Sequence, residues 1–295
     1  MMRVSVSADV LRWALERTSR SVDDLTPRFP RLARWLTGEG RPTLRQLEDF
    51  ARATHTPFGF FFLPEPPVER VPIPDFRTIR SETLRRPSPD LLDTIYLCQQ
   101  RQEWYRDYVR VAAEEPFPFV GSAKPSDDIV SVADEMRDAL AFDLEERRQI
   151  RTWTDALGRF IEQADHLGIL VMVSGVVGSN NRRRLDPQEF RGFALADPLA
   201  PLVFINGADT RAGQMFTLAH ELAHLWVGES ALTDIEPRSA PSDAVENWCN
   251  RVAAELLVPL AVVRQEYRRN APLRKELDRL ARRFKVSTLV ILRRI

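Results

Sequence analysis

Two histidines and a glutamate, spaced as in His220-Glu221-Leu222-Ala223-His224, point most directly to chemistry in this chain. On a helix, residues four positions apart share one face about 6 Å apart, so both imidazoles can reach one metal ion. Glu221 lies about 100° round the helix from His220, which places its carboxylate beside the ion rather than on it. Zinc with two imidazoles, one carboxylate and an open position is a hydrolytic arrangement that lowers the pKa of bound water towards about 7. The motif therefore predicts a zinc site at which Glu221 moves a proton from that water to a leaving amine.

A third ligand has to come from elsewhere, and the acidic residues downstream of the motif are Glu229, Asp234, Glu236, Asp243, Glu246 and Glu255. Glu229 and Asp234 follow the motif too closely to fold back onto its helix. Glu246 lies in the next predicted helix, on a face that also carries Asn250, Ala253 and Leu257. Small residues on that face let the two helices approach closely, whereas Glu255 points elsewhere and is expected at the surface or as a helix-end partner. Packing therefore favours Glu246 as the third ligand.

The remaining histidines and the two cysteines have simpler interpretations. His55 and His166 each come at the end of a predicted helix, where a histidine commonly interacts with free carbonyl groups. Cys249 shares the helix of Glu246, but a buried small thiol is commoner than a ligand there. Cys98 belongs to a hydrophobic helical stripe and is expected in the core.

The pattern of apolar residues predicts the elements that hold these side chains. Helices are expected at residues 91–111, 129–142, 150–167, 210–227, 242–258, 273–284 and 287–295. Apolar runs at residues 169–173, 190–195 and 202–205 predict short strands. The fold class expected is therefore α+β and mostly helical, with a small sheet of about three strands.

A proline-rich segment divides the chain. Residues 63–87 contain Pro64, Pro66, Pro67, Pro72 and Pro74, a spacing that favours an extended connector. Residues 1–62 before it read as short helices, with 58–63 as a packing segment and not a strand. Residues 88–164 form a helical intermediate region, and 165–295 form the domain that carries the motif, ending in a basic helical pair within 260–295.

Composition excludes several classes of protein. The chain has 295 residues, of which 44% are hydrophobic and 28% charged, as in ordinary folded proteins. It has no apolar run of membrane-spanning length, no signal-peptide core at its start and only two cysteines. Membrane, secreted and fibrous proteins are thereby excluded, and a cytoplasmic location is expected.

Two longer stretches resemble the ImmA/IrrE family of metallopeptidases. They are Phe216-Thr217-Leu218-Ala219-His220-Glu221-Leu222-Ala223-His224 and the segment from Glu246-Asn247-Trp248-Cys249 to Leu257-Val258-Pro259. The resemblance implies a zincin-like fold with His220, His224 and Glu246 as zinc ligands and Glu221 as the catalytic carboxylate. It also implies that residues 201–206 form the strand along the cleft, to whose edge a substrate segment adds.

Residues 8–60 resemble a repressor-type (Xre-like) helix-turn-helix module through Trp35, Gly38, Pro42-Thr43 and Leu47. In that family about fourteen residues separate the first leucine of the second helix from the tryptophan, whereas Leu25 to Trp35 spans ten here. The stretch that enters the major groove is therefore shortened. A degenerate module for protein contact is favoured over DNA binding, for which the candidate phosphate contacts are Arg28, Arg31 and Arg34.

The end of the chain is strongly basic, since residues 260–295 carry eleven basic and three acidic side chains. Residues 277–287 resemble a helix, a tight turn and a helix start with Ser287 as N-cap. One hypothesis is phosphate contact by this pair. The other, which we weigh equally, is an amphipathic pair that closes the peptidase domain with arginines on its solvated face.

These patterns lead to two hypotheses of different classes. The first is a zinc-dependent endopeptidase that cleaves a specific protein, which the family resemblance suggests is a transcriptional repressor or a toxin–antitoxin component. The alternative is a DNA- or partner-binding regulator that keeps the metal site for structure and never cleaves. Glu221 favours the enzyme, because a purely structural metal site has no need of it.

Overall fold

The computed structural model describes residues 3–18, 20–74, 87–233 and 244–295, and the chain divides into two compact units. The first contains the described residues of Met1–Pro72 and Ser81–Asp93, and the second those of Ile73–Arg80 and Thr94–Ile295. Each unit is described by itself. Three of the acidic residues considered as a third metal ligand lie outside the described residues: Asp234, Glu236 and Asp243.

The first unit is built from short helices around aromatic side chains. Its elements are α1 (Ala8–Arg17), α2 (Val22–Leu25), α3 (Leu32–Leu36), α4 (Leu44–Ala53) and a 3₁₀ helix, η1 (Phe58–Phe62). Ser21 and Thr43 each form a capping box, which fixes where α2 and α4 begin. The predicted packing segment is η1, whose Phe61 is fully buried against Phe50.

The arginines considered for phosphate contact lie on the surface of this unit. Arg28, Arg31 and Arg34 are all exposed, and Arg31 is the N-cap residue of α3. The guanidinium of Arg28 lies 5.4 Å from the centre of the Phe29 ring. DNA contact by these residues stays a prediction.

The second unit contains a four-stranded sheet of order β1-β5-β4-β6. Its strands are β1 (Leu170–Ser174), β4 (Gly192–Leu195), β5 (Leu202–Asn206) and β6 (Ala231–Thr233). β1 runs parallel to β5, and β4 runs antiparallel to both β5 and β6. A separate hairpin joins β2 (Val176–Val177) and β3 (Asn180–Arg184). The three predicted strands are present, and β6 and the hairpin are additional.

The prediction that residues 201–206 offer an edge to a substrate is wrong. β5 is hydrogen-bonded to β1 on one side and β4 on the other, so it has no edge left for another strand. Among the described strands of this sheet, β1 and β6 are the outer ones. On β6 the outward Leu232 N–H already donates to the Pro74 carbonyl, at 3.0 Å.

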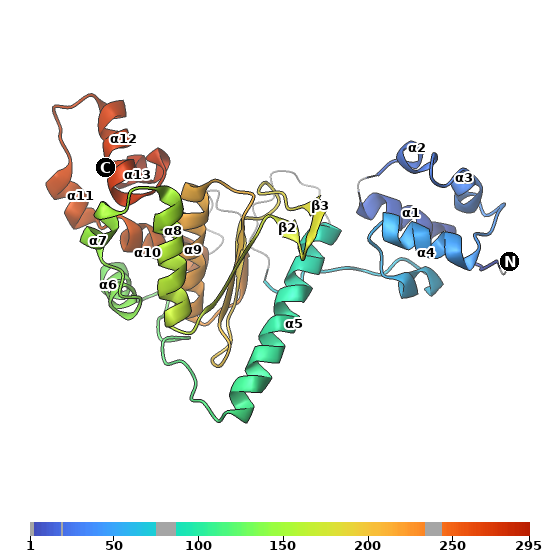
Figure 1. Cartoon of the computed structure of the whole chain (residues 1–295), viewed down its shortest axis with the longest axis horizontal. Coiled ribbons are helices and arrows are strands. Elements are labelled where there is room, and N and C mark those ends of the chain that lie inside the picture. The colour runs from blue at the N-terminus through green and yellow to red at the C-terminus, as the bar shows by residue number, and fades with distance from the viewer. Residues whose placement is uncertain (1–2, 19, 75–86, 234–243) are drawn as a thin grey trace. The chain divides into compact units, whose positions relative to one another are not determined.

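Helices cover both faces of the sheet. α8 (Trp153–His166) and α9 (Arg211–Val227) lie on one side, and α5 (Pro89–Val111) passes on the other (Figure 1). Residue alternation explains the difference between these faces. Ala194, Val203 and Ile205 belong to the core beneath α8 and α9, whereas the stacked rings of Phe193 and Phe204 lie outside that core. From α5, Gln102 donates to the carbonyls of Leu195 and Ala200.

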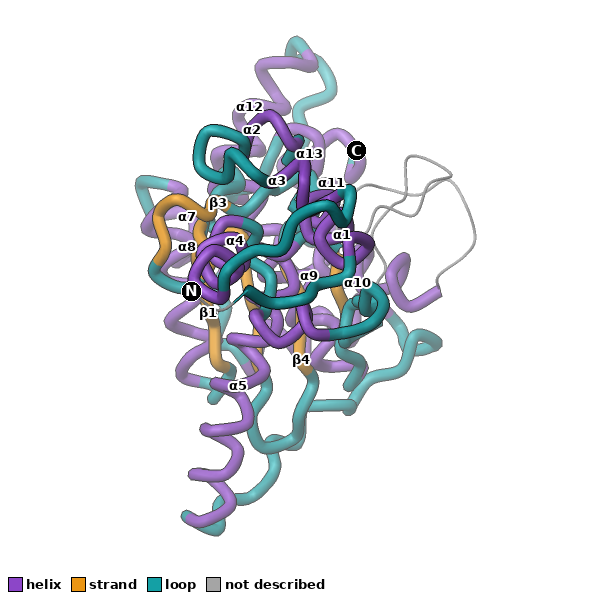
Figure 2. Tube along the Cα trace, turned by 90° about the vertical axis from the view of Figure 1, so that its right-hand side faces the viewer, coloured by secondary structure: helices purple, strands orange, loops and turns teal. Residues whose placement is uncertain are grey.

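The second unit contains further helices. They are α6 (Ile129–Ala139), α7 (Leu144–Gln149), α10 (Ala244–Leu257), α11 (Leu260–Glu266), α12 (Leu273–Phe284) and α13 (Thr288–Arg294). Figure 2 shows the same arrangement from the side, with strands β1 and β4 among the helices. As expected, Ser287 caps α13 by accepting from Val290 N–H. α7 and α11 were not predicted. The α+β, mostly helical fold class is confirmed.

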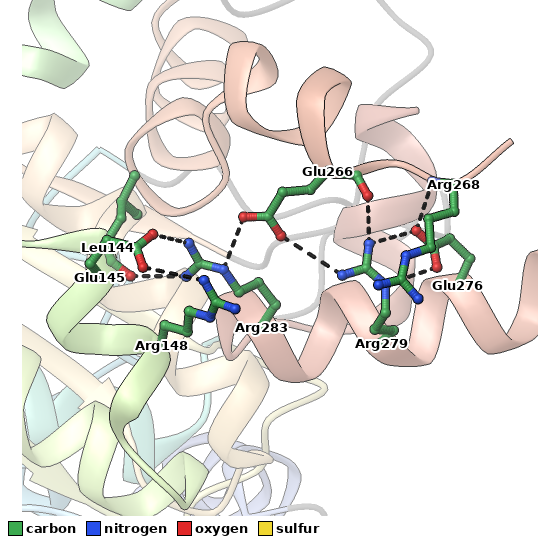
Figure 3. Close-up of polar contacts among 8 residues, drawn as sticks. All are labelled: Leu144, Glu145, Arg148, Glu266, Arg268, Glu276, Arg279 and Arg283. Atoms are coloured by element: carbon green, nitrogen blue, oxygen red, sulfur yellow. Dashed lines mark hydrogen bonds and ion pairs between the residues drawn. The ribbon is translucent and has the colours of Figure 1, made fainter.

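An ion-pair network joins the last helices to α7, as Figure 3 shows. Arg283 is bonded to Glu266 (3.1 Å) and Glu145 (2.6 Å), and it also donates to the Leu144 carbonyl. Arg279 is bonded to Glu276 at 2.6 Å and lies 3.8 Å from Glu266. Arg283 joins the helical pair to α7, which supports the domain-closing hypothesis. Arg274, Arg282 and Arg293 are exposed as that hypothesis expects, whereas Arg279 and Arg283 face carboxylates.

The structure also bears on membrane insertion. Within the described ranges, no helix combines the length and the apolar character that a membrane crossing requires.

We predict that Glu276→Gln lowers the free energy of unfolding by about 1.5–3 kcal/mol at pH 7, the usual range for a hydrogen bond to a charged group. The hydrogen bond from Arg279 lowers the pKa of Glu276 to about 2 in the folded protein. The carboxylate therefore stabilises the fold at neutral pH, and this contribution is lost as the pH falls from about 4.5 towards 2. Chemical denaturation at pH 7 and pH 3 measures the difference, with the exposed Glu135→Gln as control. A difference that does not shrink on acidification would contradict the prediction.

Candidate metal centre

Helix α9 carries the two histidines in its last turns and is buried along most of its length. Thr210 caps its start by accepting from Gly213 N–H, and Gly228 ends it in the left-handed conformation, with φ +78°. The Gly228 N–H then bonds to the carbonyls of His224 and Leu225. Leu218, Leu222 and Leu225 are fully buried, as the predicted apolar face requires, but His220 and His224 are fully buried as well. The helix therefore lies inside the domain.

Helix α10 packs against α9 and brings the carboxylate. Ala253 on the predicted small face has no exposed surface, and neither does Ala219 or Ala223 on α9. Small side chains on both helices permit this close approach. Glu246, in the first turn of α10, is buried and directed at α9.

The three predicted ligands converge on one point. Nε2 of His220 and Nε2 of His224 lie 3.0 Å apart. Oε2 of Glu246 lies 3.3 Å from His220 Nε2, and Oε1 lies 3.0 Å from His224 Nε2. The three side chains form a group whose potential ligand atoms all lie within 4.8 Å of one another. Two residues from α9 and one from α10 thus meet as the sequence predicts.

The separations fit a tetrahedral metal ion. Zinc–nitrogen and zinc–oxygen bonds of about 2.0–2.1 Å in tetrahedral geometry place neighbouring ligand atoms about 3.3 Å apart. The observed separations of 3.0, 3.3 and 3.0 Å lie close to this value. The residues present therefore suit a small divalent cation with borderline-soft character.

The electrostatics of Glu246 favour its ionised form. Burial by itself would raise the pKa of this carboxyl group, but hydrogen bonds from the rings of His220 and His224 outweigh it and hold the pKa well below its usual range. An ionised carboxylate is the form that binds a metal.

Glu221 is fully buried and lies against strand β4. A Cβ atom built on Gly192 would lie 3.2 Å from Oε1 of Glu221, 2.5 Å from Cγ2 of Thr217 and 2.8 Å from the Phe204 carbonyl oxygen. The absence of a side chain at Gly192 therefore allows the strand to approach α9 at the level of this carboxylate. The sequence gives no sign that Gly192 is a site residue, because its proximity to α9 depends on how the sheet packs.

The other acidic candidates do not join the group. Glu229 is exposed beyond the end of α9. Glu255 is buried, so the expectation of a surface position is wrong and that of a helix-end partner is right: its carboxylate accepts from Leu260 N–H and pairs with Arg294.

The remaining histidines and cysteines are placed mostly as expected. Nδ1 of His166 lies 2.5 Å from the Glu162 carbonyl oxygen at the end of α8, whereas His55 follows α4 with φ +48°. Cys249 is buried in α10. Cys98 is buried in α5, and that burial raises the pKa of its thiol to about 12.

Comparison with known proteins agrees with this geometry. Residues 164–295 match the model of the peptidase M78 family, described as the IrrE N-terminal-like domain. This part of the chain is similar to the ImmA/IrrE metalloproteases. Over 96 residues the chain is 34% identical to the radiation response metalloprotease IrrE of Deinococcus radiodurans. That alignment covers 31% of this chain and 29% of the relative. The aligned part of this chain therefore corresponds to less than a third of the length of the relative. The similarity supports a peptidase of the metal-dependent class.

We predict that Glu246→Ala or His224→Ala lowers zinc affinity by more than about 100-fold. Loss of a residue that only supports a ligand lowers metal affinity by up to about 100-fold, and loss of a ligand itself should have a larger effect. Each change removes one of three converging donors. Competition with a chromophoric chelator measures the affinity, and Glu229→Ala is the matched control because it removes a nearby exposed carboxylate. Wild-type affinity in Glu246→Ala would contradict the ligand assignment.

We predict that Gly192→Ala lowers the free energy of unfolding by about 1–3 kcal/mol, the usual cost of overpacking a core. The new methyl group would meet Thr217 and the Phe204 carbonyl at less than contact distance. Gly158→Ala is the control, since a Cβ at this helical position meets nothing within 4 Å and should stabilise by about 0.5–1 kcal/mol. Thermal and denaturant unfolding compare the two variants, and equal stabilisation by both changes would exclude the close approach at Gly192.

Proposed function

We propose that residues 164–295 form a zinc-dependent endopeptidase. The observation that carries the proposal is the convergence of His220, His224 and Glu246 on one point, with Glu221 buried next to them in the chain. Two imidazoles and one carboxylate leave a fourth tetrahedral position for water or substrate, which is the arrangement of catalytic zinc sites. The similarity of this part of the chain to metalloproteases supports the same assignment.

In this proposal different residues bind the metal and transfer the proton. Zinc, when bound, supplies Lewis acidity to the attacking water and the scissile carbonyl. His220, His224 and Glu246 hold the ion, and their burial fixes the orientation of the two rings. Glu221 accepts the proton of the attacking water and delivers it to the nitrogen of the leaving amine. The position of Glu221 against Gly192 restricts where its carboxylate can move.

The substrate that we propose is one specific protein, either a transcriptional repressor or a component of a toxin–antitoxin pair. The support comes from the ImmA/IrrE resemblance and from the helical first unit, whose sequence resembles a repressor-type helix-turn-helix module. That unit suits protein contact, since its second and third helices contain only four and five residues.

Glu221→Gln is the variant that tests turnover. We predict that co-expression of the wild-type chain with the products of neighbouring genes yields a cleaved partner, and that Glu221→Gln reduces cleavage by at least about 100-fold. Zinc content should remain one ion per chain in the variant, because Glu221 is not among the converging ligands. Mass spectrometry of the partner and metal analysis of the purified chain provide the two measurements.

The outcomes separate the enzyme from its alternative. Cleavage that persists in Glu221→Gln would exclude Glu221 as the proton carrier. A partner that binds but remains intact with the wild-type chain, while zinc is bound, would support a regulator that keeps the metal for structure. Loss of zinc in Glu221→Gln would show that the carboxylate supports the metal site itself.

A further inference from the structure

The outer face of α5 exposes large apolar side chains that nothing in the described part of the second unit covers. Trp104 is 72% exposed, Tyr108 59% and Val111 88%. The opposite face of the same helix is buried through Cys98, Gln102 and Val109, so α5 already has its contact with the sheet. Exposure of this extent at a tryptophan is unusual for a side chain without a partner surface.

These residues follow a regular spacing. Leu97, Arg101, Trp104, Tyr108 and Val111 are separated by four, three, four and three positions, which is the seam of a helix that pairs with another helix. We call these five residues the α5 seam. The rings of Trp104 and Tyr108 are stacked, with centres 6.3 Å apart and planes 14° apart. The last turns of α5 extend past the sheet in both views (Figures 1 and 2), so a second helix has access to the seam.

The charges at the two ends of the seam have opposite sign. Arg101 lies in its N-terminal half, where the guanidinium donates to Sδ of Met172 at 3.5 Å, and the exposed Glu114 and Glu115 come three and four positions after Val111. The carboxylate of neither glutamate forms an ion pair with a residue that the structure describes. Asp107, which borders the seam, lies 3.7 Å from Arg110 in its own helix. Two seams placed in parallel would oppose like charges, whereas an antiparallel arrangement joins Arg101 of each copy to the glutamates of the other.

We propose that two copies of this chain associate through antiparallel pairing of their α5 seams, centred near Tyr108. In this register Trp104 of one copy packs against Val111 of the other, the two Tyr108 rings meet at the two-fold axis, and the half-buried Leu97 lies outside the contact. Each end of the interface is closed by one Arg101 and one Glu114–Glu115 pair. The seam is self-complementary in charge, which is what a two-fold interface requires. Its small size gives a weak, reversible dimer.

The first experiment measures the mass of the full chain over a range of concentrations by sedimentation velocity. The wild-type chain should show a reversible monomer–dimer equilibrium. Trp104→Ala should weaken the dimer by about tenfold or more, because it removes the largest side chain at the seam. Tyr96→Ala is the matched control, since Tyr96 is a 51% exposed aromatic on the same helix outside the seam. A wild-type chain that stays monomeric, or equal weakening by both variants, would overturn the proposal.

A charge exchange tests the antiparallel register. Arg101→Glu places acids at both ends of the seam, and Glu114→Arg with Glu115→Arg places bases at both ends, so each variant alone should be monomeric. An equimolar mixture restores both charge pairs in a mixed dimer and should recover association. Failure of the mixture to associate would overturn this arrangement. Because the readout is mass, the result is independent of peptidase activity.

Discussion

The domain depends on one buried electrostatic contact, between the carboxylate of Glu246 and the facing rings of His220 and His224. Removing a carboxylate from water costs several kcal/mol unless strong donors or a cation replace the lost hydration. Here two imidazoles from α9 meet that demand, and Glu246 is buried where α9 and α10 pack together. A metal ion at this point would satisfy all three groups at once. The packing of the two helices and the chemistry of the site therefore rest on the same interaction.

A second constraint is the distance between α9 and the sheet. The strands carry Gly192 and Ala194 toward this helix and place the bulky Phe193 and Phe204 in the layer outside that core. Because strand residues alternate between faces, the small residues fall together on one side. The helix can then approach the sheet closely enough that Glu221 lies against the backbone of β4. The position of the proposed proton carrier is thus determined by residues that have no side-chain chemistry of their own.

The sequence predicted the parts of the site that depend on local spacing, and it failed where distant segments meet. The i, i+4 relation of His220 and His224 follows from helix geometry alone, and the small residues of α10 indicated correctly that Glu246 can approach. The order of strands in the sheet could not be predicted in this way, because no local pattern reveals that β5 lies between β1 and β4. β6 has only three residues, and α7 has a single apolar residue in six, so neither gives a periodic signal. Glu255 is buried and paired with Arg294, a residue 39 positions further along the chain, and no local pattern indicates that contact.

The uneven distribution of charge along the chain has a structural explanation. Residues 61–259 contain 32 acidic side chains against 21 basic ones, while residues 260–295 are strongly basic. Arg283 bonds to Glu145 and Arg294 to Glu255, so part of this imbalance is complementarity between two segments of one domain. The net charge of a segment therefore overstates the number of basic side chains that are available to an anionic partner. Any phosphate contact by α12 and α13 has to use the basic side chains that remain exposed there, which are Arg274, Lys275, Arg282 and Arg293.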